Sequence, residues 1–206
     1  MIISIDAGFN AFGWAAFNDR GEYVTAAWYE YKKPADKKHK VRASDLLVEQ
    51  SQAMYRELNR IVVENRATAM VVELPSGGAI SATAMRAMGM ASCMLACLAE
   101  VTKIPVEWVP PDQVKIAMTG RKDASKDDII KAVLRKYPQF HKDIQWIVYK
   151  GSTRPHSNTE HAADAVGAFE AARNGQMIRM MTKLAAPVAA AVPGQDQTPS
   201  GDPQLF

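Results

Sequence analysis

The stretch Met1-Ile2-Ile3-Ser4-Ile5-Asp6-Ala7-Gly8 opens the chain and decides the expected fold. Hydrophobic residues lead up to Asp6, and a small residue and a glycine follow it. This pattern is typical of a buried strand that ends in a carboxylate and turns sharply. A buried carboxylate is costly unless a positive charge compensates it. Asp6 therefore predicts a metal ion or a cationic partner at the end of the first strand.

Two further strands are expected directly after the first, at residues 11–17 and 22–31. Asn18-Asp19-Arg20-Gly21 between them is a hairpin turn signal. Because both connections are short, these three strands are predicted to form an antiparallel meander.

Helices and strands are expected to alternate after the meander. Apolar residues recur at helical spacing in residues 44–65, and residues 79–102 form a second long helix rich in small residues and methionine. Buried strands are predicted at residues 68–73 and 104–109, and strands joined through helices pair in parallel. We therefore expect an α/β fold with a mixed five-stranded sheet, an antiparallel meander followed by parallel strands, flanked by helices. Further helices are expected at residues 112–118, 125–136 and 159–173.

The pattern also suggests the domain boundaries. Residues 1–175 are predicted to form one domain that closes with the helix stop Asn174-Gly175. Residues 176–206 are expected to be a disordered tail, in which 176–184 could extend as helix, because the rest is too poor in apolar residues to build a core. Residues 142–155 are expected to be irregular.

The composition argues against a membrane-spanning protein, a secreted protein with disulfides and a protein that binds anions through its overall charge. The 206 residues are 48% hydrophobic, which suffices for one buried domain, and the net charge of +3 leaves any binding of an anionic partner to local patches. Cys93 and Cys97 are expected to fill one apolar helix face, which fits a reducing compartment. The chain enters a strand directly and no apolar run reaches the roughly 18 residues of a membrane span. We expect a cytoplasmic protein without a membrane partner.

Acidic residues stand at the points where ligands bind in α/β sheets. Asp6 and Glu73 both end buried strands, and the carboxyl edge of such a sheet is where ligands bind. His161 and Asp164 open the last predicted helix and share one face of it, because they are three residues apart. Folding could gather these four side chains at one edge, where they would suit Mg²⁺ or Mn²⁺. Taken singly, each of them could instead be an ordinary turn, strand-end or helix-start residue.

Four local patterns resemble the RuvC family of Holliday-junction resolvases, which have the ribonuclease-H-like fold. The resemblance spans about residues 1–173. The patterns are Ile5-Asp6-Ala7-Gly8 with Gly13-Trp14, Val71-Val72-Glu73, Pro110-Pro111-Asp112-Gln113-Val114-Lys115 with Thr119-Gly120 and Ala124-Ser125-Lys126, and His161-Ala162-Ala163-Asp164-Ala165.

The resemblance implies a metal-dependent, structure-selective endonuclease that resolves four-way DNA junctions in recombination and repair by symmetric hydrolysis of phosphodiesters. Two Mg²⁺ or Mn²⁺ ions would be held by four side chains, and two lysines would stabilise negative charge near the scissile phosphate. The implied metal ligands are Asp6, Glu73, His161 and Asp164, and the implied lysines are Lys115 and Lys126. A homodimer is implied as well, because two strands must be cut symmetrically.

The chain departs from the family pattern in places. Ala7 stands where the family commonly has proline, and residues 74–79 lack the aromatic side chain that usually follows the second acid and enters the junction. The basic residues 32–42 and the acid-poor residues 150–156 are candidate phosphate contacts in its place. The helix at 79–102 is the candidate dimer interface.

Three other functions stay open at this point. The first is a less selective nuclease of the same fold that acts on branched or forked DNA, and the second is a non-catalytic junction-binding protein. The third is an actin-like ATPase or sugar kinase, which also opens with a strand and an Asp-x-Gly turn. That third fold needs a second such half, which this sequence lacks.

Overall fold

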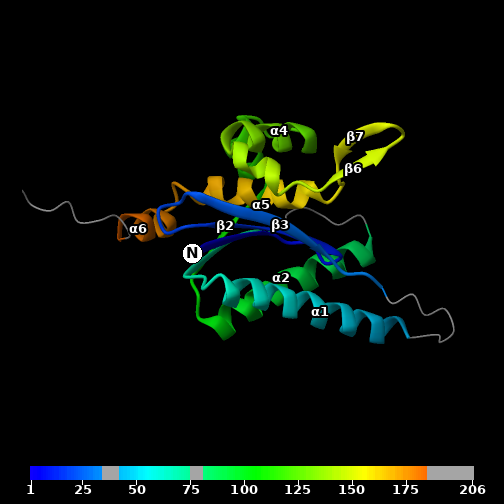
Figure 1. The fold of residues 1–206 in the computed structure, drawn as a ribbon. Helices are drawn as coiled ribbons and strands as arrows, with labels where there is room; N and C mark the ends of the chain where they lie inside the picture. Colours follow the sequence, from blue (N-terminus) through cyan, green and yellow to red (C-terminus); the bar gives the residue numbers. More distant parts are fainter. Residues whose placement is uncertain (34–41, 75–80, 185–206) are drawn as a thin grey trace, which may run out of the picture.

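The computed structural model describes residues 1–33, 42–74 and 81–184, which form a five-stranded sheet between two layers of helices (Figure 1). The strand order is β3-β2-β1-β4-β5, with an antiparallel meander at one side and parallel pairing at the other. The predicted mixed five-stranded sheet is therefore confirmed. The strands are β1 (Ile2–Asp6), β2 (Ala11–Phe17), β3 (Tyr23–Glu30), β4 (Ala69–Glu73) and β5 (Val106–Val109).

The helices divide between the two faces of the sheet, as Figure 1 shows. One face is covered by α1 and α2, and the other by α5, on which α3 and α4 pack. Their bounds are α1 (Ala43–Glu64), α2 (Ala82–Thr102), α3 (Pro111–Thr119), α4 (Lys126–Lys136), α5 (Thr159–Ala172) and α6 (Gln176–Leu184), with a 3₁₀ turn at Pro138–Lys142.

Alternation along β1 assigns its side chains to the two layers. Ile3 and Ile5 pack on the side of α1 and α2, whereas Ile2 belongs to the core beneath α5. Because successive side chains of a strand point to opposite faces, Asp6 faces α5. The same parity in β4 puts Val71 and Glu73 on the α5 side. Both strand-end acids therefore lie beneath one helix.

The helix α5 lies unusually close to the sheet. Its sequence is rich in alanine, and most of its residues are buried. The closest approach is at Gly13 of β2, where an added Cβ atom would lie 1.9 Å from the carbonyl oxygen of His161. Only glycine fits there, because real Cβ atoms do not come within 3 Å of a backbone atom. Farther along, Phe169 stacks on Phe17 with ring centroids 3.6 Å apart.

Two segments differ from the sequence-based expectation. The region at 142–155, expected to be irregular, contains a hairpin of β6 (Trp146–Tyr149) and β7 (Ser152–Pro155). Its apolar run is short, and it pairs only with itself, so no sheet periodicity reveals it. Residues 176–184, expected to belong to the tail unless they extended as helix, do form a helix, α6, whose Ile178 is fully buried against the main core. Residues 185–206 lie outside the described part of the chain.

The helix α2 also differs from expectation. Within the described residues it is the one helix long and apolar enough to cross a membrane, with a mean hydropathy of 1.4, so the expectation that no segment reaches this threshold is not met. A single such helix is weak evidence, because core helices of soluble proteins pass the same test. Only 22% of this stretch is buried, and Cys93 and Cys97 are exposed rather than packed in a core.

The contact at Gly13 gives the first prediction. Gly13→Ala should lower the free energy of unfolding by about 2–3 kcal/mol, because the new methyl group meets rigid backbone of α5. The matched control is Gly89→Ala in α2, where an added Cβ meets no atom within 4 Å and should raise stability by about 0.5–1 kcal/mol. Urea unfolding measures both, and a Gly13→Ala variant as stable as the wild type would contradict the close packing.

Candidate active site

A row of paired residues crosses the sheet at its carboxyl edge. Trp28 pairs with Gly13, Gly13 with Asp6, Asp6 with Glu73, and Glu73 with Val109. The two acids sit on neighbouring parallel strands and face the same helix. Neighbouring strands are about 4.8 Å apart, so the two carboxylates come within direct electrostatic range. The register thus confines two negative charges to one small area of the sheet.

The first two turns of α5 lie over this row and add two polar side chains. His161 Nδ1 is 2.7 Å from Asp6 Oδ2, and the side chains are only 26% and 16% exposed. Asp164 lies one turn farther along the same helix face. The bare Gly13 beneath the helix backbone is what allows His161 to come so near. The structure therefore places Asp6, Glu73, His161 and Asp164 at one edge of the sheet, where His161 is in direct contact with Asp6.

Burial and mutual repulsion change the acidity of this group. Burial, followed by the charges of Asp6 and Asp164, raises the pKa of Glu73 to about 9. Burial and the charge of Asp6 likewise raise the pKa of Asp164 to about 7. Without a cation, both acids therefore keep a proton to higher pH than ordinary carboxyl groups.

Opposing influences act on the pKa of His161. Burial alone lowers its pKa, but the hydrogen bond to Asp6 and the charges of Asp6, Glu160 and Asp164 raise it above its ordinary value. The histidine is therefore inclined to carry a positive charge when no metal ion is present. Its bond to Asp6 lets the pair share one proton at the edge of the sheet.

The two candidate lysines take different places. Lys115 on α3 is near enough to Glu73 for its charge to oppose the rise in the pKa of that acid. Lys126, the first residue of α4, forms an ion pair with Glu160 on α5 and exerts a weaker effect on Asp164. Glu160 was not among the predicted site residues, although it directly precedes His161. Its contact with Lys126 of α4 forms only in the folded protein, so the local sequence does not reveal it.

The donor set fits a divalent cation in its chemistry, although the ligands are not converged. Among the described residues, no three His, Cys, Asp or Glu side chains lie close enough together to hold an ion as they stand. Carboxylates that face each other without a cation repel one another and take up protons instead, as the raised pKa values of Glu73 and Asp164 show. Oxygen ligands that carry excess negative charge are the kind that Mg²⁺ and Mn²⁺ bind.

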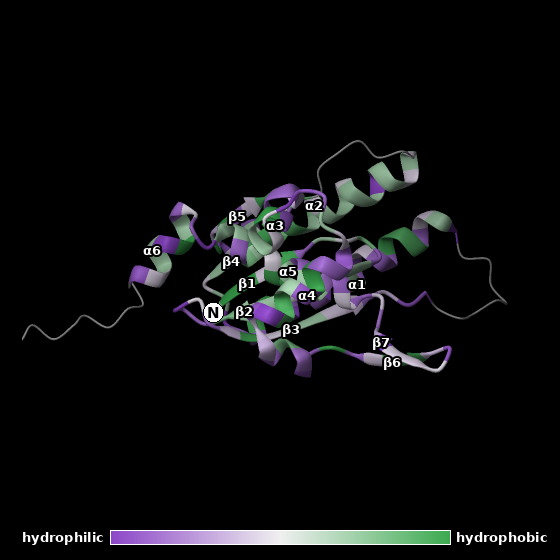
Figure 2. Cartoon of the chain, turned by 90° about the horizontal axis from the view of Figure 1, so that it is seen from above, coloured by the Kyte–Doolittle hydropathy of each residue, from purple (hydrophilic) through white to green (hydrophobic). Residues whose placement is uncertain are grey.

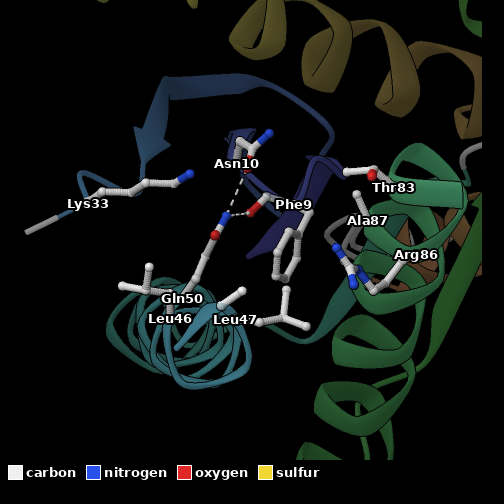
Figure 3. A pocket seen from close by; sticks show the side chains of 10 residues that line it. Phe9, Asn10, Lys33, Leu46, Leu47, Gln50, Thr83, Arg86 and Ala87 are labelled. Carbon is white, nitrogen blue, oxygen red and sulfur yellow. Dashed lines mark hydrogen bonds between the residues drawn. The ribbon is translucent and has the colours of Figure 1, made fainter. Parts of the chain in front are cut away.

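A hollow of about 250 Å³ opens beside the same edge of the sheet, between α1, the start of α2 and the turn after β1 (Figure 3). Gln50 donates to the carbonyl oxygen of Phe9 at 2.8 Å and to Asn10 at 2.9 Å, which fixes the turn. Lys33 and Arg86 flank the hollow and make it basic. Sequence reasoning missed this group, because its members come from separate segments.

Parts of two segments singled out in the sequence cannot be placed. Most of the basic residues 32–42, a candidate phosphate contact, and most of residues 74–79, which lack the family's aromatic side chain, lie outside the described residues.

The acid cluster predicts how stability depends on pH. Between about pH 4.5 and 9 the folded protein binds more protons at Glu73 than the unfolded chain, so metal-free protein should lose stability as pH rises. The raised pKa of His161 acts in the same direction, because its contribution is lost as pH rises through that pKa. Glu73→Gln should remove much of this slope and raise the free energy of unfolding at pH 8.5 by about 1–3 kcal/mol.

Denaturant titrations in chelator at pH 5.5, 7 and 8.5 measure this effect. Glu64→Gln, an exposed glutamate near the end of α1, is the matched control and should leave the slope unchanged. Equal slopes in the wild type and Glu73→Gln would show that Glu73 is an ordinary exposed acid.

Comparison with known proteins supports the fold. The structure is similar to Thermus thermophilus RuvC in complex with a Holliday junction substrate, at 18% identity and a TM-score of 0.56, over 88% of this chain and 96% of that one. A second Thermus thermophilus RuvC structure matches at 19% identity and a TM-score of 0.53, over 82% of this chain and 91% of that one. The yeast mitochondrial Holliday junction resolvase Ydc2 matches at 12% identity and a TM-score of 0.52, over 89% of this chain and 80% of that one.

These likenesses are structural. No protein-family model matches the chain. No curated protein matches it either. At identities below 20% the solved structures show the fold and leave function to the chemistry of the site. The chain thus has the ribonuclease-H-like fold of RuvC, as its sequence patterns predict.

Proposed function

We propose that this protein is a metal-dependent endonuclease that cuts four-way DNA junctions at symmetric positions. The observation that carries the proposal is the buried pair Asp6 and Glu73, joined by His161 and Asp164 of α5. Such a cluster is unfavourable in a purely structural role, because it must hold protons at neutral pH. The solved structures of this fold described above include RuvC bound to a Holliday junction, which favours branched DNA as the substrate.

The proposed chemistry is hydrolysis of a phosphodiester. The oxygen of a water molecule bonds to phosphorus, and the bond from phosphorus to a deoxyribose oxygen breaks. Two Mg²⁺ or Mn²⁺ ions, when bound, would supply an activated water and stabilise the leaving oxygen. Asp6, Glu73, Asp164 and His161 are the side chains that would hold them. These side chains must lose their protons before they can bind a metal ion. Once deprotonated, they carry excess negative charge, which a divalent cation compensates.

The remaining polar groups have supporting roles. His161 bonds Asp6 through Nδ1, so its other ring nitrogen is left to ligate an ion or to take a proton from the attacking water. The positive charge of Lys115 near Glu73 would stabilise the extra negative charge that develops on the phosphate. Lys126 stands at the rim in its pair with Glu160 and would meet the DNA backbone there.

Symmetric cleavage requires two sites, so the proposal includes a homodimer with α2 at its interface. The helix is apolar and largely exposed, and together with α1 it borders a shallow, mostly apolar groove lined by Tyr55, Met90 and Cys97. Burying such a surface against a second copy would be favourable. A molar mass of one subunit, at concentrations that cleave junctions, would contradict this part of the proposal.

A cleavage assay with matched variants tests the proposed function. The wild type should nick a mobile four-way junction at paired positions with Mg²⁺ or Mn²⁺, and should cut linear duplex far more slowly. Asp6→Asn should lower the rate by about 10²–10⁴-fold, because several kcal/mol of metal-dependent stabilisation is lost, while junction binding is retained. The control Asp19→Asn changes an exposed aspartate at the opposite edge of the sheet and should cleave normally.

Each other outcome has a clear meaning. Equal cleavage of forks and junctions would favour the less selective nuclease of the same fold. Junction binding without cleavage in either metal would favour a non-catalytic junction-binding protein. If Asp6→Asn cleaves as fast as the wild type, the assignment of the acid cluster is wrong.

A further inference from the structure

The β6–β7 hairpin stands apart from the layers of the fold. Its two strands pair only with each other, and Figures 1 and 2 show it extending away from the body of the protein. The turn residues Lys150 and Gly151 both have positive φ, 50° and 75°, as the tight two-residue turn of a hairpin requires. An isolated two-stranded hairpin is at best marginally stable, so its projecting tip adds little to the fold.

The outer part of the hairpin combines an aromatic ring with positive charge. Arg154 pairs across the strands with Ile147, which places it diagonally beside Tyr149. Its guanidinium lies 4.0 Å from the centre of the Tyr149 ring, and the Lys150 ammonium lies 5.4 Å from it. A guanidinium stacked on a ring keeps its N–H edge available and loses little freedom when it binds a planar or tetrahedral oxyanion.

The charge of this surface is not neutralised locally. Residues 144–159 contain no aspartate or glutamate. No carboxylate in the described part of the chain forms an ion pair with Lys150 or Arg154. Tyr149 is 48% exposed and Val148 is 77% exposed, so the cations and the ring are open to a large partner. The surface is therefore suited to an extended polyanion.

The base of the hairpin is fixed next to the acid cluster. His156, directly after β7, stacks on Trp28 with ring centroids 4.6 Å apart, and its backbone N–H donates to the carbonyl oxygen of Gln145. Trp28 belongs to the same cross-sheet row as Asp6 and lies two strands away, about 10 Å at the usual strand spacing. The hairpin also leads directly into α5, which carries His161.

A groove connects the two places. A hollow of about 490 Å³ lies between α4 and the segment that joins β7 to α5. Its charged lining consists of Lys126, Asp127 and Lys131 on α4, Glu160 on α5, and Arg154 at the hairpin end. A phosphate backbone that passes the acid cluster would follow this groove toward Lys131 and Arg154, because Glu160 is already paired with Lys126. No segment of the described chain fills it.

We propose that the β6–β7 hairpin binds the phosphate backbone of a DNA duplex arm that leaves the cleavage site, with Arg154 and Lys150 as the phosphate contacts. Tyr149 holds the guanidinium of Arg154 in position. The identity of the partner as branched DNA rests on the proposed function, whereas the surface itself rests on the contacts described above. Residues 74–79 lack the aromatic side chain that, by the family resemblance, would enter the junction. The hairpin would supply phosphate contacts to the DNA in its place.

Binding measured without cleavage tests this inference. Fluorescence anisotropy with a labelled four-way junction, in chelator and over a range of salt concentrations, compares the wild type with Arg154→Gln. The variant should bind about five to ten times more weakly, and the slope of log affinity against log salt should become shallower by about 0.9, the value for one lost phosphate contact. Tyr149→Leu should weaken junction binding less than Arg154→Gln does, because it leaves the charge of the hairpin unchanged.

The matched control is Arg20→Gln, which changes an exposed arginine in the β2–β3 turn at the far edge of the sheet. It should leave both affinity and salt slope unchanged. Thermal unfolding of each variant at the wild-type temperature would show that the exposed substitutions do not disturb the fold.

The outcomes separate this inference from the proposed function. Unchanged affinity and slope in Arg154→Gln would overturn the role of the hairpin even if the protein cleaves junctions. Slower cleavage at saturating protein with unchanged affinity would also overturn it, because Arg154 would then act on the chemistry. If the wild type binds junctions without ever cleaving them, and Arg154→Gln binds them more weakly, the role of the hairpin would be supported and the nuclease function rejected.

Discussion

The close approach of α5 to the sheet at Gly13 is the constraint on which the site depends. The missing side chain of Gly13 admits the backbone of His161, and this places the His161 ring against Asp6. The sheet register then sets Glu73 beside Asp6 without any further requirement. A bulkier residue at Gly13 would lift the helix and separate the histidine from the acids. The packing of α5 on Gly13 therefore both stabilises the fold and positions the side chains of the site.

The acid cluster illustrates a conflict between stability and function. Burial is what raises the pKa values of Glu73 and Asp164, and the same burial strengthens every electrostatic interaction with a bound cation. Around it, Lys115 and Lys126 approach from α3 and α4 without neutralising the acids completely. The protein thus accepts an unfavourable cluster of charge at one edge of an otherwise apolar sheet, which is the usual arrangement of a functional site.

Much of this arrangement could be predicted from sequence, because β1 and β4 are short apolar runs that each end in an acid, and α5 carries its polar residues at its start. The placement of Asp6, Glu73, His161 and Asp164 at one edge of the sheet follows from that topology. Contacts between distant segments could not be predicted, since no local pattern signals them. The stacking of His156 on Trp28 is of this kind, and so is the hairpin that it anchors.

If the buried acids under α5 form a metal site, binding of a cation must release protons from them. Calorimetric titration of metal-free protein with Mn²⁺ at pH 7.5, in two buffers of different ionisation enthalpy, counts the protons released on binding. Burial and the neighbouring acids raise the pKa of Glu73 to about 9, so this residue must lose a proton to bind a cation, and Asp164 and His161, whose pKa values are also raised, add to the release. We expect release of at least about one proton, and a release smaller by about one proton in Glu73→Gln. Binding without proton release, or equal release in Glu73→Gln, would contradict the account.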